Sequence, residues 1–457
     1  MTDDRLPPSA AGRGALDPFD GDRREVHPGV APPAPDDGPG TDLPGEPTGD
    51  AVEATADPTP IGEPLLLPPA TGDRTSSRSR RRSATLASLV ALAVAAAAVV
   101  GLVATRDGPP PADAVPLDAW VPYWTLDDAL EEAPRRLGSV REVSPFWFDA
   151  TGVEDITVSP NVDPDAAERF VAAARDAGTS VVPSVVDATG PGAMAAILAD
   201  PAERTRHVDA LVSFVDEGGY DGVDLDYEQF AFADDRSTWA ATRPAWVAFV
   251  EELSDELRSG GRSLTVSIPP VYEDERSPTS GYWVYDHGAI SDHVDRLRIM
   301  AYDYSVAEPG PIAPLEFVER SVDGALTAGV DPDKVVLGLA IYGRNWPLGV
   351  AGICPDGTVL EDTTSVNART VDELVERRGA TPVFDEVTGE WSFDYELIFA
   401  DDEASCVQSR RVHYVDGRGA RLRMDIARDR RIGAASLWAL GFDDDDVWDE
   451  LLPVVER

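Results

Sequence analysis

The stretch YDGVDLDYEQF, Tyr220–Phe230, places acidic residues at alternating positions of a segment that is typical of a buried β-strand. Successive side chains of a strand point to opposite faces, so Asp224, Asp226 and Glu228 lie on one face and apolar side chains lie on the other. A solvated polar face is the ordinary meaning of such alternation. Neighbouring like charges repel, however, and closely spaced carboxyl groups push their pKa values apart, which is how a protein makes an acid catalyst at neutral pH. The stretch alone leaves a structural and a catalytic interpretation open.

The chain around this stretch alternates strand-like runs with amphipathic helical stretches at 164–177, 201–217, 240–259 and 315–328. Eight such runs follow one another, which predicts an α/β protein: a (β/α)8 TIM barrel with right-handed parallel crossovers over residues 117–457. The runs are LDAWVPYW (117–124), REVSPFWF (141–148), TSVVPSVV (179–186), YDGVDLDYE (220–228), RSLTVSIPP (262–270), VDRLRIMAYDY (294–304), KVVLGLAIYG (334–343) and IGAASLWAL (432–440).

One long interval breaks this rhythm, between the seventh and eighth predicted strands. Its aromatic, alternating run TPVFDEVTGEWSFDYE (381–396) predicts a small α+β insertion, which together with the following helix covers residues 345–430. Within it, VTGEW (387–391) and VDGRGA (415–420) are interpreted as hairpin turns.

Composition limits the classes of partner. The 457 residues include 39 Lys and Arg against 83 Asp and Glu, a net charge of −44, which argues against nucleic acid or another polyanion. The two cysteines, Cys354 and Cys406, are too few for a disulfide-stapled scaffold and lack the spacing of a structural zinc site. We expect no metal and no cofactor, and we expect a monomer.

The N-terminal quarter differs in composition from the rest. Residues 1–77 are acidic and rich in Pro and Gly, which predicts a disordered tail. Residues 78–104 combine an Arg-rich flank with an uncharged segment, 84–104. This segment is long enough to cross a bilayer as a helix, which takes about 20 residues. The positive-inside rule then predicts a single-pass cell-membrane protein with a cytoplasmic tail, a linker at 105–116 and an extracellular barrel. A cleaved signal peptide is the alternative.

That topology has a consequence for the cysteines. Thiols outside the membrane tend to oxidise, so we expect Cys354 and Cys406 to form one disulfide.

Active sites of such barrels lie at the carboxyl ends of the strands. The acidic stretch ends the fourth predicted strand, and polar or aromatic residues end the first, sixth, seventh and eighth. Each aromatic residue alone is better explained by core packing. Together, beside a carboxyl cluster, they form a candidate site with faces suited to stacking on sugar rings, made of Tyr123, Trp124, Asp224, Asp226, Glu228, Met300, Tyr302, Asp303, Tyr342, Arg344 and Trp438.

At this point the chain resembles glycoside hydrolase family 18. DGVDLDYE, residues 221–228, matches the Asp-Gly-x-Asp-x-Asp-x-Glu signature of that family on the fourth barrel strand. MAYD, residues 300–303, is similar to the family's sixth-strand motif, and Trp438 sits like its eighth-strand tryptophan.

The resemblance implies a role for each matched residue. Glu228 would be the general acid, and Asp226 would orient the substrate's own N-acetyl group, which attacks the anomeric carbon in place of an enzyme nucleophile. Asp224 would share a proton with Asp226. Tyr302 would hydrogen-bond the acetamido oxygen. Asp303 would hold the sugar, and Trp438 would form the floor of the subsite.

The expected reaction is therefore hydrolysis, with retention, of a β-1,4-linked glycan that contains N-acetylglucosamine. The third strand, VVPSVVDATG, lacks the Ser-x-Gly-Gly of typical chitinases. The insertion and the ending SLWALGFDDDDVW look more like the bacterial branch related to spore-germination, cortex-cleaving proteins, which favours peptidoglycan over chitin as the substrate. One alternative is a lectin-like barrel that binds sugar without cleaving it, and the intact Glu228, with Asp226 and Tyr302, weighs against it. The other is a surface scaffold, which would leave the acidic strand face without explanation.

Overall fold

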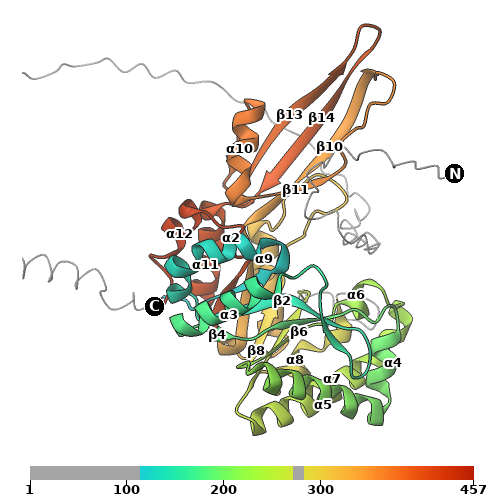
Figure 1. Cartoon of the computed structure of the whole chain (residues 1–457), viewed down its shortest axis with the longest axis vertical. Coiled ribbons are helices and arrows are strands. Elements are labelled where there is room, and N and C mark those ends of the chain that lie inside the picture. Colours follow the sequence, from blue (N-terminus) through green and yellow to red (C-terminus); the bar gives the residue numbers. More distant parts are fainter. Residues whose placement is uncertain (1–113, 271–281, 457) are drawn as a thin grey trace, which may run out of the picture. The chain divides into compact units, whose positions relative to one another are not determined.

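The computed structural model describes residues 114–270 and 282–456, all of which belong to one compact unit. Eight parallel strands close into a barrel, because the first strand pairs with both the second and the last (Figure 1). The predicted barrel is thereby confirmed. Its strands are β1 (Leu117–Pro122), β2 (Glu142–Ala150), β5 (Ser184–Asp187), β6 (Gly222–Asp226), β7 (Ser263–Ile268), β8 (Arg296–Ile299), β9 (Val335–Ala340) and β15 (Ala434–Trp438). Two short strands accompany them: β4 (Ser180–Val181) precedes β5, and β3 (Ile156–Val158) pairs antiparallel with the end of β2.

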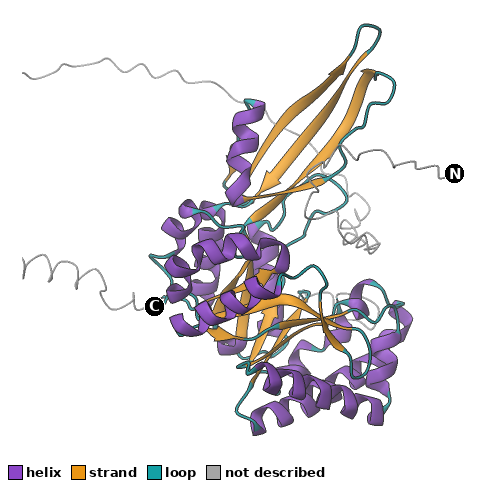
Figure 2. Ribbon diagram, in the orientation of Figure 1, coloured by secondary structure: helices purple, strands orange, loops and turns teal. Residues whose placement is uncertain are grey.

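Helices surround these strands (Figure 2). They are α2 (Leu126–Arg136), α3 (Pro164–Ala177), α4 (Ala193–Ala199), α5 (Pro201–Gly218), α6 (Gln229–Phe232), α7 (Trp239–Ser259), α8 (His287–Ser291), α9 (Leu315–Thr327), α11 (Gly417–Arg430) and α12 (Asp445–Leu451). Short 3-10 turns lie at Tyr123–Thr125, Leu137–Ser139, Arg236–Thr238, Trp283–Tyr285 and Pro332–Lys334.

Local sequence sets the ends of these helices. The Asp163 carboxylate accepts hydrogen bonds from the backbone N–H groups of Asp165 and Ala166, and Pro164 occupies the first turn of α3. The helix ends at Gly178, whose φ of 80° lies in the left-handed region that glycine adopts without strain. These caps explain why the predicted bounds, 164–177, match those of the helix.

The insertion leaves the barrel after β9 and consists of a five-stranded antiparallel sheet and one helix. The sheet order is β11-β10-β14-β13-β12, and α10 (Ala368–Arg378) packs on it through Val371 and Leu374. The α+β insertion is thus confirmed, as is the disulfide between Cys354 and Cys406. The strands are β10 (Tyr342–Ile353), β11 (Thr364–Asn367), β12 (Val383–Asp385), β13 (Glu390–Ala400) and β14 (Ser405–Tyr414).

One of the two predicted hairpin turns is wrong. VTGEW does join β12 to β13, but VDGRGA begins helix α11 instead of turning a hairpin. The Asp416 side chain accepts a hydrogen bond from the backbone N–H of Gly419 and so caps the helix. Gly417 lies against the backbone of Asp446, where a Cβ would come within 2.7 Å of the carbonyl oxygen. The glycines of this motif therefore serve close packing rather than a turn.

The predicted tail, the membrane segment 84–104 and residues 105–113 of the linker lie outside the described residues. Within residues 114–270 and 282–456, no helix is both long and apolar enough to cross a bilayer.

Candidate active site

The acidic face of β6 points into the barrel. Asp224 lies within the strand and Asp226 is its last residue, and both side chains are buried. Glu228 follows two residues later, directly before α6. Tyr227 points the opposite way, and its hydroxyl lies 2.7 Å from the imidazole Nε2 of His207 on α5. The alternating sequence therefore places the acidic side chains inside the barrel and the side chain of Tyr227 against the surrounding helices.

Neighbouring strands surround Asp224 with hydrogen-bond donors. Ser184 of β5 donates to its Oδ2 at 2.6 Å, and Ser267 of β7 donates to its Oδ1 at 2.8 Å. Arg298 of β8 donates to Oδ2 at 3.0 Å. The third-strand serine thus holds the first carboxylate although the glycine pair of typical chitinases is missing.

Arg298 is a site residue that sequence reasoning missed. Its guanidinium is fully buried and also donates to Ser144 at 3.0 Å and to Glu142 at 3.1 Å, both on β2. It lies over the ring of Trp120, with 4.4 Å between its central carbon and the ring centroid. The sequence RLRI, residues 296–299, could have indicated this role. Arginines at alternating positions of a buried strand need hydrogen-bond acceptors inside the barrel.

The two carboxyl groups nearest the mouth of the barrel have raised pKa values. Burial, reinforced by the charges of Glu228 and Asp224, raises the pKa of Asp226 well above its usual range, and Arg298 acts in the opposite direction. Burial and the charge of Asp303 raise the pKa of Glu228 from 4.5 to about 7. Glu228 can therefore carry a proton near neutral pH, as a general acid must.

A tyrosine outside the predicted set supports this loop. Tyr285 is fully buried, and its hydroxyl donates to the carbonyl oxygen of Tyr227 at 2.7 Å. That bond holds the peptide that joins Tyr227 to Glu228, so the position of Glu228 relative to Asp226 depends on it.

The end of β8 and the start of the insertion meet at Asp303. Its Oδ1 accepts hydrogen bonds from the Tyr342 hydroxyl and, at 2.8 Å, from Arg344, both on β10. Asp303 has a φ of 57°, a left-handed conformation that costs a non-glycine residue about 1–3 kcal/mol. Two donors from β10 therefore hold this carboxylate in a defined place.

Aromatic rings line the same end of the barrel. Trp438 contacts the rings of Trp120, Phe146 and Tyr302, with centroid separations of 5.5, 5.1 and 6.3 Å. The 3-10 turn after β1 supplies Tyr123 and Trp124, whose rings meet edge to face at 4.9 Å. Trp124 lies 6.4 Å from Trp438. All of these rings except the fully buried Trp120 are partly exposed, which makes them candidates for contact with a sugar.

Met300 and Tyr302 lie in the segment directly after β8. Both are partly buried and pack against the barrel core. Burial and the charges of Asp226, Glu228 and Asp303 raise the pKa of Tyr302 well above its usual range, so its hydroxyl remains a hydrogen-bond donor. The structure thus places the eleven predicted site residues in or directly after barrel strands or at the start of β10, while their individual roles remain predictions. In the described part of the chain, no group of three or more His, Cys, Asp or Glu side chains is arranged to hold a metal ion.

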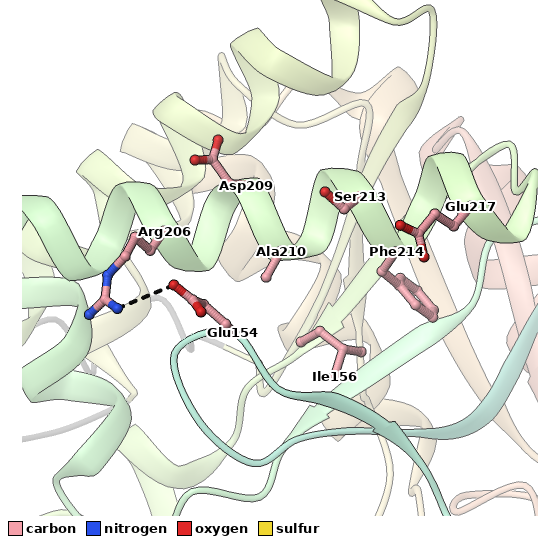
Figure 3. Close-up of a pocket in the computed structure, with 8 residues that line it drawn as sticks. All are labelled: Glu154, Ile156, Arg206, Asp209, Ala210, Ser213, Phe214 and Glu217. Atoms are coloured by element: carbon pink, nitrogen blue, oxygen red, sulfur yellow. Dashed lines mark hydrogen bonds and ion pairs between the residues drawn. The ribbon is translucent and has the colours of Figure 1, made fainter.

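A surface pocket lies elsewhere, between α5 and the segment around β3 (Figure 3). Its apolar floor includes Ile156 and Phe214, and its cation, Arg206, pairs with Glu154 at 3.2 Å. None of the predicted site residues lines this pocket, so we assign it no part in the chemistry.

Comparison with known proteins gives the family. The model of the glycosyl hydrolases family 18 matches residues 154–443, which include the acidic stretch, the end of β8 and Trp438. The chain belongs to this family.

Relatives include a glycosylase and two solved structures. The chain is 30% identical over 248 residues to YdhD of Bacillus subtilis, which is named as a sporulation-specific glycosylase, covering 53% of this chain and 52% of YdhD. The chitinase of Chromobacterium violaceum aligns with a TM-score of 0.60 at 23% identity over 74% of this chain and 98% of the other. The spore cortex-lytic enzyme SleL of Bacillus megaterium aligns with a TM-score of 0.61 at 16% identity over 77% of each chain. The chain spans about half the length of YdhD, and the two solved structures show a shared fold.

Proposed function

We propose that this family 18 glycosidase hydrolyses β-1,4-linked glycans that contain N-acetylglucosamine, with retention of configuration, and that its substrate is peptidoglycan rather than chitin. The observation that carries the reaction is the pair formed by Glu228, whose pKa is raised to about 7, and the buried Asp226 beside it. They lie at the barrel mouth together with Tyr302 and Trp438.

Glu228 begins the reaction by giving its proton to the glycosidic oxygen as the bond to the anomeric carbon breaks. The carbonyl oxygen of the substrate's N-acetyl group attacks that carbon and forms a cyclic oxazolinium ion. Asp226 accepts a hydrogen bond from the acetamide N–H and so stabilises the positive charge. Tyr302 donates to the acetamide oxygen.

Water completes the reaction on the face that the leaving group has vacated. Glu228, now a carboxylate, takes a proton from the water as its oxygen attacks the anomeric carbon and opens the ring. Two displacements at one carbon return the original configuration. The protein forms no ester with the sugar, which distinguishes this route from one with an enzyme nucleophile.

Two observations support peptidoglycan. YdhD is named as sporulation-specific and SleL as a spore cortex-lytic enzyme. The third strand, in addition, holds Asp224 through Ser184 without the glycine pair of typical chitinases.

The test uses the detergent-solubilised full chain with purified peptidoglycan and, separately, with N-acetylglucosamine oligomers. We expect peptidoglycan to be cleaved faster, and we expect the first product, followed by NMR, to keep its anomeric configuration. Faster cleavage of the oligomers would identify a chitinase. Binding of either glycan without cleavage would identify a lectin-like barrel, and an inverted product would contradict the mechanism.

We further propose that the barrel acts outside the cell membrane, anchored by segment 84–104. The Arg-rich flank of that segment and the disulfide between Cys354 and Cys406 support this location, because disulfides persist in oxidising compartments.

A further inference from the structure

We propose that an acidic pocket on the face of the inserted sheet that α10 covers binds an aliphatic amine in its ammonium form. The pocket has a volume of about 300 Å³ and lies between α10, the sheet and the starts of α11 and α12. None of its residues is among the predicted site residues, so the proposal does not depend on the reaction at the barrel mouth. Its acidic and aromatic lining residues are Asp372, Trp391, Tyr414, Asp416, Asp444 and Asp446.

The inserted sheet separates this acidic pocket from the candidate active site. Tyr414 pairs with Gly343 of β10, so these two residues share one face of the sheet, and Tyr414 packs there in the cluster that includes Val371 of α10. The next residue of β10, Arg344, therefore points to the other face, where it donates to Asp303. The pocket is thus a second site, on the opposite side of the sheet from Asp303.

The negative charge of the pocket is unbalanced within the described part of the chain. Its four Asp side chains form no ion pair with any described residue, and no Lys, Arg or His lines the pocket. Asp416 and Asp444 accept hydrogen bonds from backbone N–H groups at the starts of α11 and α12, which accounts for their presence. Asp372 caps no helix. Burial and the charges of Asp446 and Asp372 raise the pKa of Asp444, so a cation placed among these groups would relieve their repulsion.

A buried hydroxyl group without a partner indicates that the pocket holds a ligand rather than only solvated charge. Tyr414 is 4% exposed, and its hydroxyl makes no hydrogen bond to any described residue. Burial and the charges of Asp416 and Asp372 raise the pKa of this hydroxyl, which places it near both carboxylates. Buried polar groups normally have a hydrogen-bond partner. An ammonium ion has three N–H donors and could serve the hydroxyl and both carboxylates at once.

The other walls of the pocket fit an organic cation rather than a metal ion. No three acidic side chains of the described residues are arranged to hold a metal. The ring of Trp391 lines the pocket and is held by its indole N–H, which donates to Asp416 at 2.7 Å. Aromatic rings attract ammonium ions, and Val371 and Val375 of α10 offer apolar surface to an alkyl stem. The lining therefore matches an aliphatic amine in both charge and polarity.

The experiment measures binding to the detergent-solubilised full chain by isothermal titration calorimetry. One probe is 1,5-diaminopentane, a free amine, and the other is Nα-acetyl-lysine methylamide, which presents the amine as a peptide side chain does. The Nε-acetylated form of the second probe keeps the stem and lacks the charge. Binding of the charged probes supports the proposal, and the tighter of the two identifies whether the pocket prefers a free amine or a peptide side chain.

Two variants test the pocket, and a third is the matched control. Asp372→Asn combined with Asp446→Asn removes two charges of the pocket, and Tyr414→Phe removes only the hydroxyl. Glu373→Gln combined with Asp449→Asn is the control, because both residues are exposed on α10 and α12 outside the pocket and change the net charge equally. Thermal unfolding shows which variants fold.

We expect the double pocket variant to weaken binding of the charged probes about tenfold or more, because two nearby charges are lost. Tyr414→Phe should weaken binding about threefold to tenfold, the effect of one hydrogen bond. The control variant should bind like the wild type, and the acetylated probe should not bind. Added salt should weaken binding to the wild type, since it screens the attraction.

Binding of the acetylated probe as tight as that of the charged one would overturn the proposal, as would unchanged affinity in the folded double pocket variant. An equal loss in the control variant would overturn it too, because net charge alone would then explain the binding. If the double pocket variant does not fold, the comparison of charged and acetylated probes on the wild type and on Tyr414→Phe decides the question.

Discussion

The three acidic residues on one face of the acidic stretch differ in their hydrogen-bond partners and in their position in the barrel. Asp224 accepts from two serines and an arginine, Asp226 has a buried oxygen without a donor among the described residues, and Glu228 stands at the barrel mouth. The alternation in the sequence sufficed to place all three on one face. It could not distinguish them, because the donors come from strands that lie 40 to 74 residues away in the chain.

Replacement of Glu228 by glutamine tests its role as general acid. Glutamine keeps the shape and hydrogen bonding but has no transferable proton, so kcat should fall roughly 100-fold or more while glycan affinity survives. A general acid must be protonated, so wild-type activity should decline as pH rises through about 7, the raised pKa of Glu228. Kinetics across pH measure both effects. Near-normal turnover in Glu228→Gln would exclude this assignment.

The same substitution should stabilise the fold at neutral and alkaline pH. The pKa of Glu228 is raised from 4.5 to about 7 by burial and by Asp303, so the folded state binds its proton more tightly than the unfolded chain does. The contribution of Glu228 to stability is therefore full below about pH 4.5 and is lost as pH rises toward 7. Thermal unfolding of Glu228→Gln and wild type should diverge over that window, with the variant higher. Parallel curves would show that Glu228 is not desolvated.

Helices and strands could be predicted where the residues that determine them lie close together in the sequence. The caps of α3 lie within a few residues of the helix, and strand periodicity located the barrel strands. VDGRGA was wrongly predicted to be a turn because Gly417 packs against Asp446, which is distant in sequence and gives no local signal. Arg298 was overlooked for a related reason, since its acceptors on β2 lie more than 150 residues away.

The disulfide that joins Cys354, directly after β10, to Cys406 on β14 offers a test at this scale. It links residues 52 positions apart, and loss of such a link costs typically about 2–4 kcal/mol. The double variant Cys354→Ser, Cys406→Ser should therefore unfold at lower temperature and be cut sooner by protease within 345–410. Its kcat should stay close to wild type, because neither cysteine is among the predicted site residues. A large loss of kcat in the folded variant would instead show that the inserted sheet contributes to the reaction.

The topology of the whole molecule yields a prediction for intact cells. If segment 84–104 anchors the chain with its Arg-rich flank inside, external protease should remove the barrel and leave residues 1–77 protected. Antibodies against the tail and against the barrel, before and after permeabilisation, measure this. Recovery of a free protein whose N-terminus lies near residue 105 would show a cleaved signal instead, and a protected barrel would place the chain the other way round.

The way β10 leaves the barrel limits how the insertion can be exchanged between relatives. Tyr342 and Arg344 hold Asp303, yet they already belong to the first strand of the inserted sheet. A chimera joined at the end of β9 would replace Tyr342 and Arg344 along with the rest of the insertion. Asp303 would then face whatever residues the relative has at those two positions. A junction after Arg344 keeps both hydrogen bonds to Asp303. We therefore expect chimeras joined there to be active.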